Sequence, residues 1–477
     1  MSQLLLFYVR PEPGTWVYLS IFLLVGVFFV FHRLWSVRNL DIVLLILLTP
    51  GILLVYEGRK LRRESPQMIP TSTVADITDE EAQPLQYVTL QPDDPLPAAL
   101  QPSAAAAARM PTSWTADELE FAGFTALLIA CGLLMIRMLI DPALVRRPLL
   151  EPNLSIGGLS FIGVSLFLFL MSNVVTSDPE LSHQRGPKLG PGYALLNRLP
   201  DLPTTPEHEG PVWNGGDGTG DRPWVFNLAR ALVIFSNLAV VVAIVGVGYW
   251  HFDNVKTGIG CATMYLLFPY SAQMAGNIEH ELPAALLTLA VLAYRQPLIA
   301  GCFLGLASGL VYYPLFLLPL WISFYFHRGL GRLLLGVVAM LALLACLLLL
   351  GGWANFLEDI RDMFGLWRPA MNNLSGIWGL GFDPMFRLPV LVAFILLSFS
   401  FVFWPPRKTL GTLMCGTAAV MLAAQFWHGY GGGLYMAWFL PCVLLTVFRP
   451  NLDDRIAVRV VSPNWTRSDR LSVNANP

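Results

Sequence analysis

Charged side chains are scarce in this chain, and its cysteines are few and scattered. Asp, Glu, Lys and Arg make up 13% of the 477 residues, about half the fraction that is usual in soluble domains. A net charge of −2 provides no basic surface for nucleic acid, and no zinc-finger spacing is present. The cysteines stand singly in apolar segments, so we predict no disulfide framework, no metal site and no cofactor. They are Cys131, Cys261, Cys302, Cys346, Cys415 and Cys442.

Motifs of soluble enzymes are also missing. Residues 214–220, Asn-Gly-Gly-Asp-Gly-Thr-Gly, resemble a glycine-rich phosphate loop, but no Lys-Ser/Thr pair follows them. We therefore interpret them as a turn-rich loop. The sequence contains neither a nucleophile elbow nor HExxH. Duplicated halves with interrupted helices, which are typical of secondary transporters, are not recognisable.

Hydrophobic residues dominate instead, at 55% of the chain. The runs at 20–31, 333–350 and 388–404 are long enough, or nearly so, to cross a hydrocarbon core of about 30 Å. The sequence predicts an all-α polytopic membrane protein with about thirteen transmembrane helices. These helices are expected at residues 16–34, 41–56, 121–140, 156–171, 224–249, 259–270, 282–294, 298–311, 314–326, 333–350, 389–404, 410–426 and 434–447.

Three polar connections organise the chain. Residues 1–56 contain two N-terminal helices, and residues 57–118 form a Pro- and Ala-rich loop that cannot bury enough apolar surface to fold alone. A helical core covers residues 119–448. Within it, residues 172–223 mix Pro and Gly with apolar side chains, and we expect them to lie over a membrane-embedded site. Residues 351–387 place Trp among charges, as an interfacial amphipathic segment does.

Basic residues on the short connections predict the orientation. They fall on alternate turns, and the positive-inside rule makes that side cytoplasmic, together with a tail at 449–477. The three long connections are then extracytoplasmic. The basic cluster at 59–63 lies on the predicted outer side, an exception that long loops tolerate. The first apolar run has no signal-peptide pattern and is interpreted as a retained helix. The predicted location is the bacterial inner membrane.

The most informative segment is 269–283, Pro-Tyr-Ser-Ala-Gln-Met-Ala-Gly-Asn-Ile-Glu-His-Glu-Leu-Pro. It places Glu279, His280 and Glu281 side by side between two strongly apolar segments. Ionisable groups at a membrane boundary are costly to desolvate and indicate a functional site. The alternative is a hydrated helix cap at the lipid interface.

Three further motifs accompany this segment. After Gly276-Asn-Ile-Glu-His-Glu come an apolar stretch, the turn 294–297 (Tyr-Arg-Gln-Pro), the run 300–307 (Ala-Gly-Cys-Phe-Leu-Gly-Leu-Ala) and 313–319 (Tyr-Pro-Leu-Phe-Leu-Leu-Pro). The order resembles that of GT-C membrane glycosyltransferases, in particular the bacterial branch related to polyprenol-phosphate-mannose-dependent mannosyltransferases. Small residues at a helix interface are the alternative explanation of Gly301 and Gly305.

Two departures from this family are visible. A basic residue is expected just before Pro314, where this chain has Tyr312 and Tyr313. The family also carries its catalytic acid in the first outer loop. If the two leading helices are an addition, the corresponding residue here is Asp178 or Glu180. Either departure implies a changed donor or a scaffold that no longer catalyses.

The resemblance implies transfer of a hexose such as mannose, with inversion, from a polyprenyl-phosphate donor in the membrane lipid to an extracytoplasmic acceptor. The chemistry needs a carboxylate to take the acceptor proton and polar groups to hold the phosphate. Candidate bases are Glu279, Glu281, Asp178 and Glu180. Candidate substrate-binding residues are Asn277, His280, Arg230, Tyr312 and Tyr313, although snorkelling explains Arg230 better than a role in binding does. The alternatives are a transporter or flippase-like carrier, and a non-catalytic scaffold that binds protein partners of unknown identity.

Overall fold

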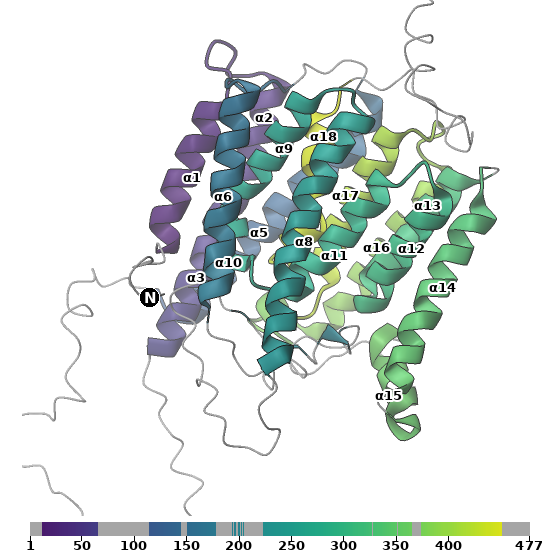
Figure 1. Cartoon of the computed structure of the whole chain (residues 1–477). Helices are drawn as coiled ribbons and strands as arrows, with labels where there is room; N and C mark the ends of the chain where they lie inside the picture. The colour runs from purple at the N-terminus through teal and green to yellow at the C-terminus, as the bar shows by residue number, and fades with distance from the viewer. Residues whose placement is uncertain are drawn as a thin grey trace, which may run out of the picture.

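The computed structural model describes residues 12–64, 114–144, 150–177, 223–326, 328–350, 352–364 and 374–450, with positions 193, 195, 196, 199, 200, 202 and 204 between the third and fourth ranges. The described residues are helical (Figure 1). The N-terminal part contains α1 (Pro13–Phe28), α2 (Val37–Ile46), α3 (Leu48–Glu64), α5 (Ala116–Ile140), η4 (Asp141–Ala143), α6 (Ile156–Thr176) and α8 (Pro223–Trp250). The middle contains α9 (Val255–Leu267), α10 (Pro269–Met274), α11 (Ile278–Leu292), α12 (Pro297–Leu310), η7 (Tyr313–Leu317), α13 (Leu318–Tyr325), α14 (Leu330–Leu349) and α15 (Trp353–Phe364). The C-terminal part contains η8 (Gly376–Trp378), η9 (Pro384–Phe386), α16 (Arg387–Phe403), α17 (Leu410–Trp427), η10 (Met436–Trp438) and α18 (Leu440–Phe448).

The all-helical class was predicted, but the number of long spans is smaller than thirteen. Seven helical segments among the described residues are long and apolar enough to cross a membrane. They are Val37–Arg62, Ala116–Ala143, Ile156–Thr176, Trp224–Trp250, Leu330–Leu349, Pro384–Phe403 and Leu410–Trp427. Other predicted spans are shorter helices, and several of them begin at or next to a proline. The segment predicted at 259–270 ends at Leu267, and Pro269 starts a new helix at a position where its missing N–H costs nothing.

The N-terminal polar loop is shorter than predicted. Residues 57–64 continue α3, and α5 begins at Ala116. The two helices run close together because Gly51 and Gly58 on α3 and Gly123 on α5 bring the backbones into contact; a Cβ at Gly58 would lie 2.9 Å from the Ala116 carbonyl oxygen. Arg62 pairs with Asp117 and, at 3.2 Å, with Glu120. The basic cluster therefore belongs to a packed helix, and residues 65–113 lie outside the described part.

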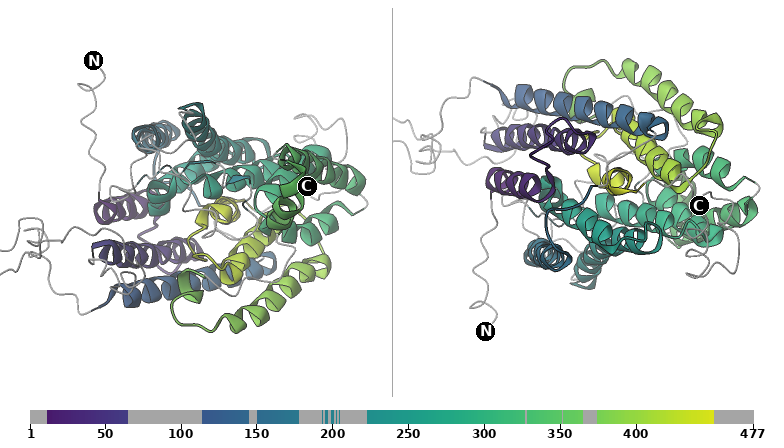
Figure 2. Two further views of the ribbon diagram at one scale, coloured as in Figure 1. Left: turned by 90° about the horizontal axis from the view of Figure 1, so that it is seen from below. Right: turned by 90° about the horizontal axis from the view of Figure 1, so that it is seen from above.

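One core joins both ends of the chain. Buried side chains from α1 to α18 form one continuous apolar cluster, so α1–α3 are packed into the same body as the later helices. Figure 2, seen along the helices, places the yellow C-terminal helices in the middle, with purple and blue helices on one side and teal ones on the other. The central position explains why α17 is the most buried of the seven spans.

The helix α14 joins this body along a seam of small residues. A Cβ added at Gly301 of α12 would lie 2.2 Å from the Leu333 carbonyl oxygen, and one at Gly336 of α14 would lie 2.4 Å from the Leu298 carbonyl oxygen. Neither position can hold a larger side chain without separating the helices. The run 300–307 thus has a packing role in this structure.

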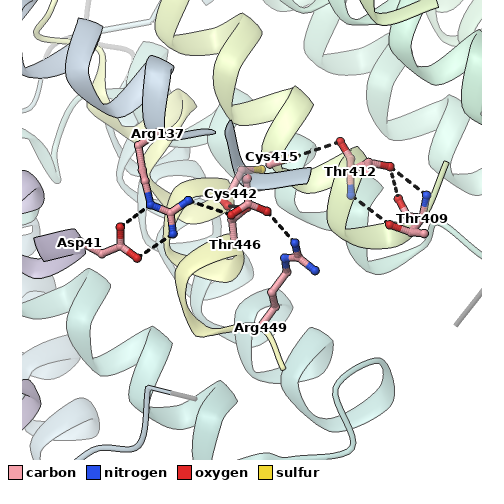
Figure 3. A network of polar contacts seen from close by, with 9 residues as sticks. Asp41, Arg137, Thr409, Thr412, Cys415, Cys442, Thr446 and Arg449 are labelled. Atoms are coloured by element: carbon pink, nitrogen blue, oxygen red, sulfur yellow. Dashed lines mark hydrogen bonds and ion pairs between the residues drawn. The ribbon is translucent and has the colours of Figure 1, made fainter. Parts of the chain in front are cut away.

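A charged ladder closes the end of the bundle where α17 begins (Figure 3). Arg137 binds Asp41 through two hydrogen bonds of 2.6 and 2.9 Å and donates a third, of 3.0 Å, to Asp141. The other oxygen of Asp141 accepts a 2.6 Å bond from Arg449. Asp141 is fully buried. We call these four residues the charged ladder; they connect α2, α5 and the segment after α18.

Candidate functional site

The opposite end of α17 opens into a glycine-rich turn at residues 428–435. Gly431 and Gly433 adopt φ angles of +80° and +99°, which favour glycine. The Gln425 side chain accepts the Gly433 N–H at 3.0 Å, and Ser375 exchanges backbone hydrogen bonds with Gly429 and Gly431. These contacts hold the turn against the bundle and bring His428 and Tyr435 into its interior, where both are buried.

Aromatic rings gather around Tyr435. Its ring centroid lies 4.2 Å from that of His428 and 4.4 Å from that of His280. Tyr313 stacks on the other side of His428 at 5.1 Å, and the Tyr193 hydroxyl lies 2.8 Å from His428 Nε2. We call the group the Tyr435 cluster; its members are Tyr193, Tyr270, His280, Tyr312, Tyr313, Trp427, His428, Tyr435 and Trp438.

Glu279 lies at the edge of the Tyr435 cluster, in the first turn of α11. It is 5% exposed, and its Oε1 is 3.8 Å from His280 Nε2. The Glu279 carbonyl oxygen accepts a 3.0 Å hydrogen bond from the Trp438 indole N–H. A carboxylate in the first turn is favoured by the positive end of the helix dipole. Glu279 and His280, predicted from one motif, therefore share one buried site.

Glu281 occupies a different environment from Glu279. Its side chain is fully buried, and its Oε2 accepts a 2.9 Å hydrogen bond from the Tyr265 hydroxyl of α9. Its other oxygen, Oε1, has no hydrogen-bond partner among the described residues. Burial of a carboxyl oxygen without a partner is costly, so Glu281 is a candidate for proton binding rather than for contact with a large substrate.

A buried positive charge, which the sequence did not predict, lies near Tyr312 and Tyr313. Arg387, at the start of α16, is 3% exposed and donates to the Trp427 carbonyl oxygen at 3.1 Å. Its guanidinium lies 5.6 Å from the Trp427 ring centroid and interacts electrostatically with Tyr312 and Tyr313. Tyr312 and Tyr313 stack on each other at 4.3 Å. A buried cation beside tyrosine hydroxyls can bind a phosphate group.

Two further predicted site residues, Asn277 and Arg230, make their hydrogen bonds outside the Tyr435 cluster. Asn277 is the N-cap of α11 without a side-chain capping bond, and its amide contacts Met274 Sδ at 3.4 Å. Arg230 donates to the Ser177 carbonyl oxygen at 2.7 Å. Asp178 and Glu180 lie outside the described residues.

Parts of the connection 172–223 reach the site. Besides Tyr193, Thr204 donates to the Gln273 carbonyl oxygen at 2.8 Å. Leu202 packs so closely on Gly276 that a Cβ there would lie 1.9 Å from the Leu202 carbonyl oxygen. The glycine of the 276–281 motif is thus required for contact with this connection.

Burial sets the protonation of the histidine in the glycine-rich turn. Burial lowers the pKa of His428 well below its ordinary value, and the charges of His280 and Arg387 act in the same direction. His428 is therefore neutral at physiological pH. The Nδ1 of His428 accepts the Tyr430 backbone N–H at 3.2 Å, so the proton of the neutral imidazole is on Nε2, which donates to the Tyr193 hydroxyl oxygen.

The sequence analysis missed Arg387, His428, Tyr435 and Tyr270. The available signal was the run 427–435, Trp-His-Gly-Tyr-Gly-Gly-Gly-Leu-Tyr, which lies between two apolar segments and contains histidine, tyrosine and glycine.

Comparison of the chain with protein-family models, with curated proteins and with solved structures found no match. The functional argument therefore depends on the residues themselves.

Proposed function

We propose that this protein is an integral membrane glycosyltransferase that moves a hexose such as mannose from a polyprenyl-phosphate donor to an acceptor hydroxyl. The observation that carries the proposal is the meeting of Glu279, the Tyr435 cluster and Arg387 at one end of α17. A buried carboxylate, a set of aromatic rings and a buried cation are the groups that such a transfer needs for its base, its sugar and its phosphate.

The proposed reaction is a single displacement. The acceptor oxygen forms a bond to the anomeric carbon while the bond from that carbon to the phosphate oxygen breaks. Glu279 takes the acceptor proton, and the polyprenyl phosphate leaves with its charge held near Arg387, Tyr312 and Tyr313. Attack from the side opposite to the leaving group inverts the anomeric centre. No nucleotide-binding domain is needed because the donor is lipid-linked.

We further propose that the site faces the extracytoplasmic side of the inner membrane and that the C-terminus is cytoplasmic. Short basic turns support this orientation: Arg33, Arg295, Arg328 and Arg407 lie on connections between helices, and Lys256 lies in the first turn of α9. In Figure 1 the turn from α13 to α14 is at the upper end of the bundle, and the helix α15, which leads into a long connection, is at the lower end. The positive-inside rule places the short basic turns in the cytoplasm.

Exchange of Glu279 for Gln tests the base. Glu279→Gln keeps the size of the side chain but removes the proton acceptor, so turnover is expected to fall about 10²-fold or more. The assay measures consumption of polyprenyl-phosphate [³H]mannose by purified protein in lipid nanodiscs, with membrane extract as the source of acceptor. Glu281→Gln is the matched control, since this neighbour in the same turn keeps its bond from Tyr265 and should retain turnover.

The loop carboxylates provide the opposing outcome. Loss of activity in Asp178→Asn or Glu180→Gln, with full activity in Glu279→Gln, moves the base to the connection 172–223. A wild-type protein that neither binds nor consumes the labelled donor refutes the enzyme proposal.

A proton-coupled carrier is the second candidate, and Glu281 is the observation that favours it. A fully buried carboxylate with one oxygen lacking a hydrogen-bond partner in the described part of the chain is typical of a proton-binding group in membrane transport. Proteoliposomes with a pH-sensitive dye inside distinguish the two candidates. Proton uptake that is abolished by Glu281→Gln, in protein without sugar-transfer activity, supports the carrier.

A further inference from the structure

Tyr270 lies behind the histidine that faces Glu279. Tyr270 is fully buried in α10, and its hydroxyl contacts Nδ1 of His280. A phenol has one proton to donate. His280 Nδ1 is the acceptor found for that proton among the described residues, so Nδ1 carries no hydrogen.

The tautomer of His280 follows from this bond. In a neutral imidazole one nitrogen accepts and the other donates, and the partner of one nitrogen decides which tautomer is present. With Nδ1 accepting from Tyr270, the proton is on Nε2. Nε2 is the atom 3.8 Å from Oε1 of Glu279.

The ring of His280 is held in this orientation. It stacks on Tyr435 with centroids 4.4 Å apart and an interplanar angle of 21°, and its side chain is 5% exposed. A flip that exchanged the two nitrogens would lose the bond to Tyr270. The arrangement is therefore a chain of oriented donors, from the Tyr270 hydroxyl through His280 toward the Glu279 carboxylate.

We propose that Tyr270 is a positioning residue that holds His280 in its Nε2–H tautomer, so that an N–H group is directed at the base Glu279. An N–H directed at the carboxylate fixes its orientation relative to the acceptor. Without Tyr270, His280 can protonate Nδ1 and turn a lone pair, which cannot donate, toward Glu279. This role rests on the proposed function where it concerns catalysis, but the tautomer itself does not.

The tautomer is tested first, by ¹⁵N NMR of histidine-labelled protein in nanodiscs. Assignment uses a His280→Gln variant, since the chain has seven histidines. The expected wild-type spectrum shows Nε2 of His280 protonated and Nδ1 unprotonated. Tyr270→Phe is expected to introduce the Nδ1–H tautomer. A wild-type spectrum with Nδ1 of His280 protonated overturns the proposal, and this result does not depend on whether the variant folds. An unchanged His280 tautomer in folded Tyr270→Phe also overturns it.

The matched control is Tyr265→Phe. Tyr265 is equally buried, lies on the adjacent α9 and donates to Glu281 instead. Tyr265→Phe removes one buried hydroxyl, as Tyr270→Phe does, but leaves the His280 tautomer unchanged.

In the mannose-transfer assay, Tyr270→Phe is expected to lower kcat about 10-fold with little change in KM, whereas Tyr265→Phe alters neither. If the wild-type protein shows no turnover, the proposed function is refuted, but the tautomer measured by NMR is not affected. If wild type and Tyr270→Phe have equal kcat, the positioning role is refuted.

Discussion

The two ends of α17 carry buried charge in different ways. At its start, the charged ladder pairs two carboxylates with two guanidinium groups, and each carboxylate is bound at 3.0 Å or less. At its end, Glu279 and Arg387 lie among tyrosines, tryptophans and histidines. In the charged ladder the ionised groups bind one another directly. At the other end the ionisable groups are gathered with aromatic and titratable side chains, as is common at functional sites.

The comparison separates a structural region from a chemical one. Removing one partner of the charged ladder leaves an uncompensated charge at the packed end of the bundle. Removing a charge from the site end alters what can bind there. Substitutions in the charged ladder should therefore lower the stability of the fold, whereas substitutions at the site end should change substrate binding and turnover.

The largest effect is expected at Asp141. Asp141→Ala leaves Arg137 and Arg449 with one carboxylate fewer, and breaking a buried pair costs about 3–5 kcal/mol. The midpoint of thermal unfolding of purified protein in detergent measures the loss. Turnover per folded molecule is expected to equal that of wild type, because the charged ladder and the proposed site lie at opposite ends of α17. An unchanged midpoint contradicts the structural role of the charged ladder.

A smaller effect of the opposite kind is expected at Arg387. Arg387→Gln removes a charge-assisted hydrogen-bond donor, which is worth about 1.5–3 kcal/mol, so KM for polyprenyl-phosphate mannose should rise about 10-fold or more. Arg361→Gln, at an exposed arginine of α15, is the control and should leave KM unchanged. If both variants have the wild-type KM, the phosphate is bound elsewhere.

The smallest effect concerns pH and His428. The folded protein keeps His428 neutral, while the unfolded chain protonates it below about pH 6.5. The unfolded state then binds more protons, so stability is lost as the pH falls below that value. Between about pH 6.5 and 5.5 the loss is roughly 1 kcal/mol. Thermal unfolding midpoints at pH 7.5 and 5.5 measure this loss of stability. The difference between the two midpoints should be smaller in His428→Gln than in wild type. An equal difference in both proteins would exclude His428 as the source.

Sequence patterns predicted the class of fold better than its details. Apolar runs identify helices because membrane spans need long apolar segments. They do not show where a helix is divided, which here depends on Pro269, Pro314 and Pro441 at the starts of short helices. They also do not show where α3 ends, because its last turns are held by ion pairs with α5.

The site was predicted in part for a similar reason. Glu279 and His280 belong to one short motif, and Tyr312 and Tyr313 follow the next helix along the chain, α12. His428 and Arg387 come from α17 and α16, and no local spacing relates them to Glu279. Their proximity results from the packing of these helices and from the glycine-rich turn 428–435. Glu281, beside Glu279 in sequence, points to Tyr265 because neighbouring residues on a helix face different directions.

The seam between α12 and α14 has a consequence for the order of assembly. Gly301, Gly305 and Gly336 allow two backbones to touch, and this contact forms only when both helices have turned their glycine faces toward each other. Such docking follows membrane insertion, since lipid provides no hydrophobic force between finished helices. We therefore expect α14 to dock on α12 after both helices are inserted, and a bulky residue at any of the three glycines to separate these two helices.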